Sequence, residues 1–167
     1  MVETRTVVDK LRVTYEGIFS MHELHAEIDN WLREKGYDKM EKKNVEKVTP
    51  KGKDIELLLQ PWKKITDYAK IILNIRLIAT GITEVEIEKD GTKVKMNQGS
   101  VQLSFDGWLV TDYENRWEGK PIFFFLRQIF DRYIYKPYTM GYENAVAKDA
   151  GDIYGEVKAF LNLYKYR

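Results

Sequence analysis

The sequence contains no cysteine, and this absence removes several kinds of chemistry at once. Without thiols there are no disulfide bonds, no thiolate ligands for a metal ion and no cysteine nucleophile. No apolar run approaches the roughly 18 residues of a membrane-spanning helix. The N-terminus, MVETRTVVDK, mixes acidic and basic residues and lacks the apolar core of a secretory signal. We therefore expect no membrane span and a cytoplasmic location.

The chain also lacks a large net charge. The 27 Lys and Arg residues nearly balance the 26 Asp and Glu residues, which gives a net charge of +1. A near-neutral chain is not a general binder of polyanions. The single basic run contains Lys39, Lys42, Lys43, Lys47, Lys51 and Lys53. No aromatic residue interrupts these lysines, and Glu41 and Glu46 dilute them, so a solvated edge strand explains the run better than a nucleic-acid site.

What the sequence does contain is enough for a hydrophobic core. With 167 residues, 44% of them apolar and 13% aromatic, the chain is expected to fold as one domain over residues 1–167. Lys and Glu are abundant and cysteine is missing. This bias indicates a thermophilic, archaeal origin, although it is equally typical of AT-rich genomes.

The first 62 residues predict three strands and one helix. Apolar and polar residues alternate over Thr4–Phe19, as in a half-buried strand. Ser20 and Glu23 have the spacing of a capping box at the start of a helix that ends near Gly36. Two further strands are expected at 38–49, which is lysine-rich and exposed, and at 54–62.

The Asp90-Gly91 dipeptide is the strongest hairpin signal in the chain. As a two-residue loop it places Glu opposite Lys on one face and apolar residues opposite each other on the second face. The four pairs are Glu88–Lys93, Glu86–Lys95, Ile87–Val94 and Val85–Met96.

The same pairing argument predicts two more turns. A loop at Thr80-Gly81-Ile82 pairs Leu77 with Val85, Ile75 with Ile87 and Arg76 with Glu86. A loop at Gln98-Gly99 pairs Met96 with Val101 and Val94 with Leu103. The result is a four-stranded antiparallel meander with one continuous apolar face. That face consists of Leu73, Ile75, Leu77, Val85, Ile87, Val94, Met96, Val101, Leu103 and Phe105.

The stretch from Trp117 to Tyr138 is the most aromatic part of the chain. It predicts a helix that begins at Pro121, ends near Tyr135 and is apolar over most of its girth. Such a helix is normally buried, so we expect the apolar face of the sheet to cover it. Pro137 is expected to interrupt the helix, and a second helix follows over 139–164.

This order of elements, a strand, a helix, about six antiparallel strands and C-terminal helices, resembles the helix-grip fold of the START, Bet v 1 and polyketide-cyclase-like superfamily. The resemblance covers nearly the whole chain as an order of elements and includes no family motif. It implies an α+β fold in which a curved sheet wraps around C-terminal helices and an apolar cavity lies between them. Two features depart from the family: the N-terminal helix is single, and the C-terminal helix is interrupted.

Two functions are compatible with this architecture. The first is non-catalytic binding of an apolar or amphipathic small molecule between sheet and aromatic helix. The alternative is a protein-interaction or homo-oligomeric assembly module that uses the C-terminal aromatic helices. The predicted ligand-binding residues are Leu77, Val85, Met96, Leu103, Phe105, Trp108, Phe125, Arg127, Ile129 and Tyr133.

Other candidate sites have simpler interpretations. His22, His25 and Asp29 have the spacing of a metal site, but His25 also fits the apolar stripe of its helix, and no metal or other cofactor is expected. Arg127 and Asp131 form an ordinary helix ion pair as readily as a pocket wall. The aromatic residues that would pack or line the mouth of a cavity are Trp108, Tyr113 and Trp117. No motif of catalysis or phosphate binding is present.

Overall fold

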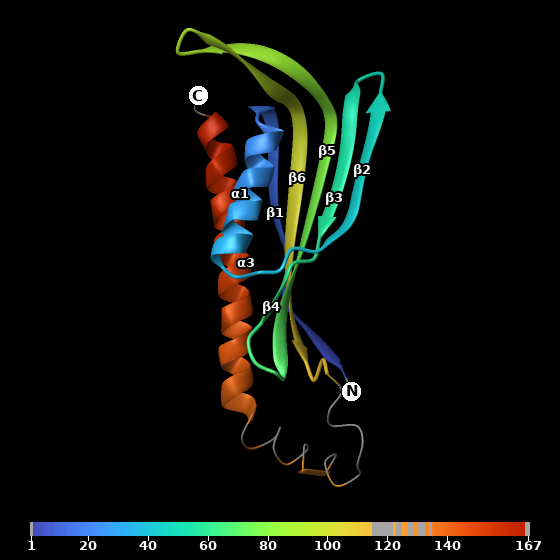
Figure 1. The fold of residues 1–167 in the computed structure, drawn as a ribbon, viewed down its shortest axis with the longest axis vertical. Helices are drawn as coiled ribbons and strands as arrows, with labels where there is room; N and C mark the ends of the chain where they lie inside the picture. The colour runs from blue at the N-terminus through green and yellow to red at the C-terminus, as the bar shows by residue number, and fades with distance from the viewer. Residues whose placement is uncertain are drawn as a thin grey trace.

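The computed structural model describes residues 2–114 and 135–165, together with Ile122, Phe125, Leu126, Ile129 and Tyr133 between them. These residues form an α+β fold in which a six-stranded antiparallel sheet carries two helices on one face (Figure 1). The predicted fold class is therefore confirmed. None of the helices described is long and apolar enough to cross a membrane.

A strand and a helix come first and a helix comes last, as expected, and five strands are described between them where about six were expected. The strands and helices are β1 (Glu3–Phe19), α1 (Met21–Glu34), β2 (Glu41–Thr49), β3 (Gly52–Leu59), β4 (Trp62–Lys64), β5 (Ala69–Lys89), β6 (Thr92–Thr111) and α3 (Tyr135–Lys165). Hydrogen bonds connect the strands in the order β1-β6-β5-β3-β2, and β4 pairs with β5 on the edge that β3 also uses. Strand β2 is thus an exposed edge, as its lysines predicted.

Helix α1 begins and ends at the predicted residues. The Ser20 hydroxyl accepts a hydrogen bond from the Glu23 backbone N–H at 3.2 Å, which satisfies one of the free donors of the first turn. At the other end Gly36 has a φ of +74°, a conformation that glycine adopts at little cost. The N–H of Tyr37 then bonds the Leu32 carbonyl at 2.9 Å and closes a Schellman motif.

The pairing of β5 with β6 confirms one predicted register and corrects two. All four predicted pairs around Asp90-Gly91 are present. The loops predicted at Thr80-Gly81-Ile82 and at Gln98-Gly99 are wrong, because β5 and β6 continue through them as strands of 21 and 20 residues. Leu77 consequently pairs with Leu103 instead of Val85. Both registers match apolar residues with apolar residues, so pairing alone could not choose between them.

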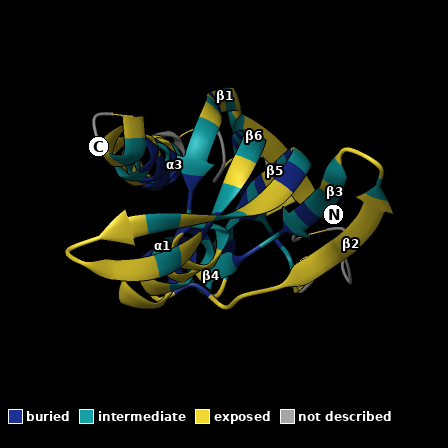
Figure 2. Cartoon of the chain, turned by 90° about the horizontal axis from the view of Figure 1, so that it is seen from above, coloured by how far each residue is buried: buried dark blue, intermediate teal, exposed yellow. Residues whose placement is uncertain are grey.

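The glycines of the predicted loops lie at a bulge that bends the sheet. Gly81 has a φ of +61° and lies where the β5–β6 register shifts between Thr80 and Thr83. Gly99 lies opposite this bulge and pairs with Gly17 of β1 on its second side. Beyond the bulge, the end of the β5–β6 hairpin arches over the N-terminal end of α1 (Figures 1 and 2).

The core lies between the inner face of the sheet and the two helices. Buried residues recur every three or four positions on both helices, the spacing of a helix face. They are Leu24, Ile28, Trp31 and Leu32 on α1 and Val146, Ala150, Ile153, Val157 and Leu161 on α3. Helix α3 is described from Tyr135 and includes Pro137, so the expected interruption of the helix at Pro137 is wrong.

Candidate functional site

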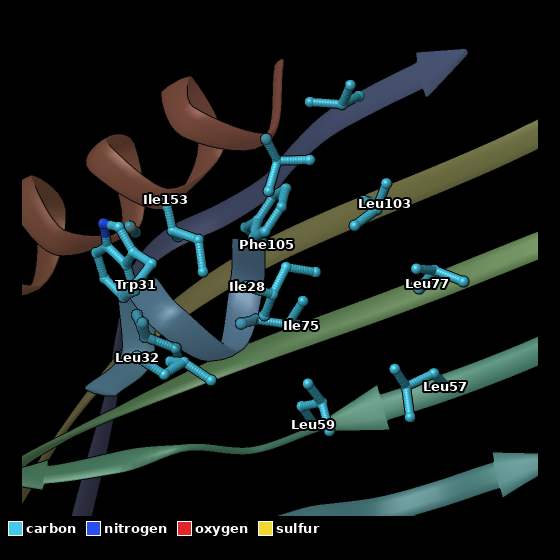
Figure 3. Packing of buried hydrophobic residues seen from close by; sticks show 14 of the residues in the cluster. Ile28, Trp31, Leu32, Leu57, Leu59, Ile75, Leu77, Leu103, Phe105 and Ile153 are labelled. Atoms are coloured by element: carbon cyan, nitrogen blue, oxygen red, sulfur yellow. The ribbon is translucent and has the colours of Figure 1, made fainter. Parts of the chain in front are cut away.

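Three of the predicted pocket residues lie deep in the core. Leu77, Leu103 and Phe105 are at most 1% exposed and belong to the hydrophobic core. Phe105 lies beside Ile28 of α1 and Ile153 of α3, and Leu103 and Leu77 lie further along β6 and β5 (Figure 3). The ring of Phe105 also meets that of Tyr154 edge to face at 6.3 Å. These side chains are therefore core residues, and Phe105 packs between the sheet and both helices.

Three more predicted pocket residues lie elsewhere. Val85 and Met96 pair with each other in the part of the hairpin that projects beyond the bulge. Trp108 pairs with Ile72, and both alternate with buried neighbours, so they belong to the outer face of the sheet. The expectation that Trp108 lies at the mouth of a cavity between sheet and helix is therefore wrong.

The remaining pocket residues come from the aromatic stretch. Phe125, Ile129 and Tyr133 are 64%, 45% and 76% exposed, so the prediction that they pack against the apolar face of the sheet is wrong. Side chains of α1 and α3 cover that face instead. Arg127 lies outside the described residues, as do Trp117, Phe124 and Asp131. Ligand binding by the ten residues stays a prediction, but those described do not converge on one site.

The exposed residues of the aromatic stretch form a surface of their own. Ile122, Phe125, Leu126, Ile129 and Tyr133 have helical conformation and follow the spacing i, i+3, i+4, i+7, i+11. This spacing places all five side chains on one side of a helix. Each is between 45% and 76% exposed. We call this surface the apolar helix face.

A second candidate is a buried polar cluster between α1, β4 and α3. The Tyr37 hydroxyl donates to Asp149 Oδ2 at 2.7 Å, and Lys63 Nζ donates to the same oxygen at 2.8 Å. The Lys63 ammonium also lies 4.6 Å from the centre of the Tyr37 ring, which stacks on Trp31 at 5.7 Å. Each charge thus has an opposite charge or a strong hydrogen bond, as buried charges require.

The electrostatics of this cluster favour a structural role. Burial, and then the hydrogen bond to Asp149 and its negative charge, raise the pKa of Tyr37 above its usual value. A phenol that holds its proton more tightly is a poorer acid at neutral pH. The cluster therefore connects three elements more readily than it transfers protons.

Sequence patterns did not predict the cluster, because Tyr37 and Asp149 are 112 residues apart. One signal was available. Asp149 lies three residues after Val146 and four before Ile153, inside the apolar stripe of its helix. A carboxylate at such a position needs a partner, and Tyr37 and Lys63 provide it.

His25 of α1 is the third unusual group. Its Nε2 atom is buried and has no hydrogen-bond partner within the described chain. Burial lowers the pKa of His25, while the charge of Asp29 raises it by a smaller amount. The imidazole is therefore held neutral at neutral pH with one polar atom unsatisfied.

The other candidate groups have ordinary packing or surface roles. Among residues 2–114 and the described part of the remainder, no group of three or more His, Asp or Glu side chains could hold a metal ion. Asp29 pairs with Lys39 at 2.8 Å. Tyr113, predicted near a cavity mouth, donates its hydroxyl to the Thr66 carbonyl at 3.0 Å. The lysines of the basic run include Lys43, which pairs with Glu56 at 2.6 Å.

The apolar helix face and the buried Nε2 atom of His25 are thus two features that the packing of the described residues leaves unexplained. The side chains of the apolar helix face are the kind that bind other surfaces by burial of apolar area. A comparison with protein-family models finds none that matches this chain, and a comparison with curated proteins finds no match either.

Proposed function

We propose that this chain is a docking module that binds another macromolecular surface through its apolar helix face. One observation carries the proposal: Ile122, Phe125, Leu126, Ile129 and Tyr133 share one side of a helix and all remain exposed. Apolar residues scattered singly over a surface are ordinary, but a contiguous patch of this kind marks an interaction site.

The free energy available from this surface is sufficient for reversible docking. Complete burial of a side chain of this size contributes about 1.5–3 kcal/mol. Because roughly half of each side chain remains to be buried, the five together offer on the order of 5 kcal/mol before the cost of association.

The absence of cysteine allows a direct test. A Leu126→Cys variant has a single thiol in the apolar helix face, and a Val48→Cys variant has a single thiol on β2, where the native side chain is 75% exposed. The labelling rate of each thiol is measured in intact cells and in dilute purified protein. We expect the thiol at position 126 to be labelled several-fold more slowly in cells than in dilute protein. The thiol at position 48 should be labelled at the same rate in both.

Equal rates in cells and in dilute solution at position 126 would contradict docking through this face. Equal slowing at both positions would also contradict it, because general crowding or poor permeation of the reagent affects both thiols. Circular dichroism of each variant confirms that the fold is retained.

A second candidate function is the binding of an amphipathic small molecule next to His25. It is supported by the buried Nε2 atom of His25, which lacks a partner within the described chain, and by a sheet and C-terminal helix compatible with the helix-grip arrangement. Native mass spectrometry is expected to show a retained mass that a His25→Phe variant loses. A wild-type spectrum at the mass of the bare chain would overturn this candidate.

A further inference from the structure

The sequence around the apolar helix face has a local excess of positive charge. Residues 120–136 contain four cations, Lys120, Arg127, Arg132 and Lys136, and one carboxylate, Asp131. This is an excess of three positive charges in 17 residues, whereas the whole chain has an excess of one. The remainder of the chain therefore carries two excess negative charges.

Two of the cationic residues are direct sequence neighbours of residues in the apolar helix face. Arg127 directly follows Leu126, and Arg132 directly precedes Tyr133. A second copy of this chain docked on the face would bring two such positive segments together, which repel each other. The complementary surface is therefore both negatively charged and apolar.

We infer that the apolar helix face docks on the surface of an anionic lipid bilayer. This inference rests on the proposed docking function and names its partner. A helix that lies in the membrane interface buries Phe, Leu and Ile side chains at the level of the headgroups, and its Lys and Arg residues contact anionic lipids. Tyrosine, here Tyr133, is enriched at the same depth because its ring is apolar and its hydroxyl is polar.

Met140 is a further exposed apolar residue close in sequence to the apolar helix face. Met140 follows Tyr133 by seven residues in the sequence and is 64% exposed in α3. Met140 thus adds one exposed apolar side chain on α3, whose later turns are packed on the sheet through Val146 and Ala150.

Flotation with vesicles tests the inference. The full chain is mixed with vesicles of phosphatidylcholine alone, or of phosphatidylcholine and phosphatidylserine, at low and at high salt. We expect binding to the anionic vesicles that weakens at high salt. Leu126→Ser with Ile129→Ser should abolish it, whereas the matched control Val45→Ser with Val48→Ser, on β2, should leave it unchanged. Arg132→Gln should weaken binding roughly fivefold.

Other outcomes would overturn the lipid partner without overturning docking. Equal binding to neutral and anionic vesicles would exclude recognition of charge. Failure to bind any vesicle, together with a concentration-dependent mass in light scattering that the Leu126→Ser and Ile129→Ser variant loses, would identify a second copy. If the chain neither binds vesicles nor self-associates, and the thiol at position 126 is still protected in cells, the partner would be a protein.

Discussion

Gly107 of β6 lies directly beneath Val146 of α3. A Cβ atom added to Gly107 would lie 2.7 Å from Val146 Cγ1 and 3.5 Å from Ala150 Cβ. The backbone of Gly107 is not in the left-handed region, so the glycine provides space and not an unusual conformation. The missing side chain thus lets α3 approach the sheet closely at this point.

We predict that Gly107→Ala destabilises the protein by about 1–3 kcal/mol, the usual cost of an extra methyl group in a packed core. Val146 is fully buried and β-branched, so it has little freedom to move away. The measurement is the free energy of unfolding in urea. Because Val146→Ala removes the clashing atom, the double variant should lose less stability than the sum of the single variants.

Gly151 of α3 provides the control. A Cβ atom there would meet nothing within 4 Å, so Gly151→Ala should stabilise the helix by roughly 0.5–1 kcal/mol. If Gly107→Ala were as harmless as Gly151→Ala, the close approach of α3 to β6 would be contradicted.

We predict that Tyr37→Phe lowers the free energy of unfolding by about 1–3 kcal/mol. The variant removes the hydroxyl that donates to Asp149 and leaves a buried carboxylate with Lys63 alone. The stacking of the ring on Trp31 is retained, so packing changes little. Urea unfolding measures the effect, and no loss of stability would show that water replaces the hydroxyl at no cost.

We also predict that the Tyr37 hydroxyl makes the free energy of unfolding depend on alkaline pH. The pKa of Tyr37 is raised in the folded protein by burial and by Asp149. Its contribution to stability is therefore fully present below the unfolded value of about 10 and is lost as the pH rises above it. The wild type should lose unfolding free energy more steeply above pH 10 than Tyr37→Phe does. Parallel slopes for the two proteins would rule this out.

The fold was predictable where local signals agreed with long-range pairing. The cap at Ser20, the stop at Gly36 and the hairpin at Asp90-Gly91 each depend on residues close in sequence. The bulge at Gly81 was not predictable in this way. A glycine next to a change of register is typical of both a loop and a bulge, and only the contacts of β5 with β3 and β6 decide between them.

The candidate site was less predictable, because apolar composition does not tell which surface will cover a helix. The stretch around Phe125 was expected to pack on the apolar face of the sheet. Helix α3 covers that face instead, with smaller residues such as Val146 and Ala150. The buried cluster needed a contact between Tyr37 and Asp149 that no local pattern records. Exposure and long-range contacts are properties of the fold and not of a segment.

We predict that His25 makes the free energy of unfolding sensitive to mild acid. Burial lowers its pKa below the unfolded value of about 6.5, so the contribution of the neutral imidazole to stability is present above that value and is lost as the pH falls below it. Wild-type protein should therefore lose more unfolding free energy between pH 7 and pH 5 than His25→Phe. Urea unfolding at the two pH values measures the difference, and an equal loss in both proteins would show that other groups cause it.

Gly99 distinguishes the observed register of β6 from the predicted loop. In the observed register a Cβ atom at Gly99 would lie 2.6 Å from Ile82 Cδ1 and 3.0 Å from the carbonyl oxygens of Thr80 and Gly81. The backbone oxygens belong to the bulge and cannot rotate away, so Gly99→Ala should cost about 1–3 kcal/mol of unfolding free energy. Adding Ile82→Ala should recover little, since it relieves only one of these three contacts. At the tip of a loop the same alanine would meet no strand, and a stability equal to that of the wild type would therefore favour the loop.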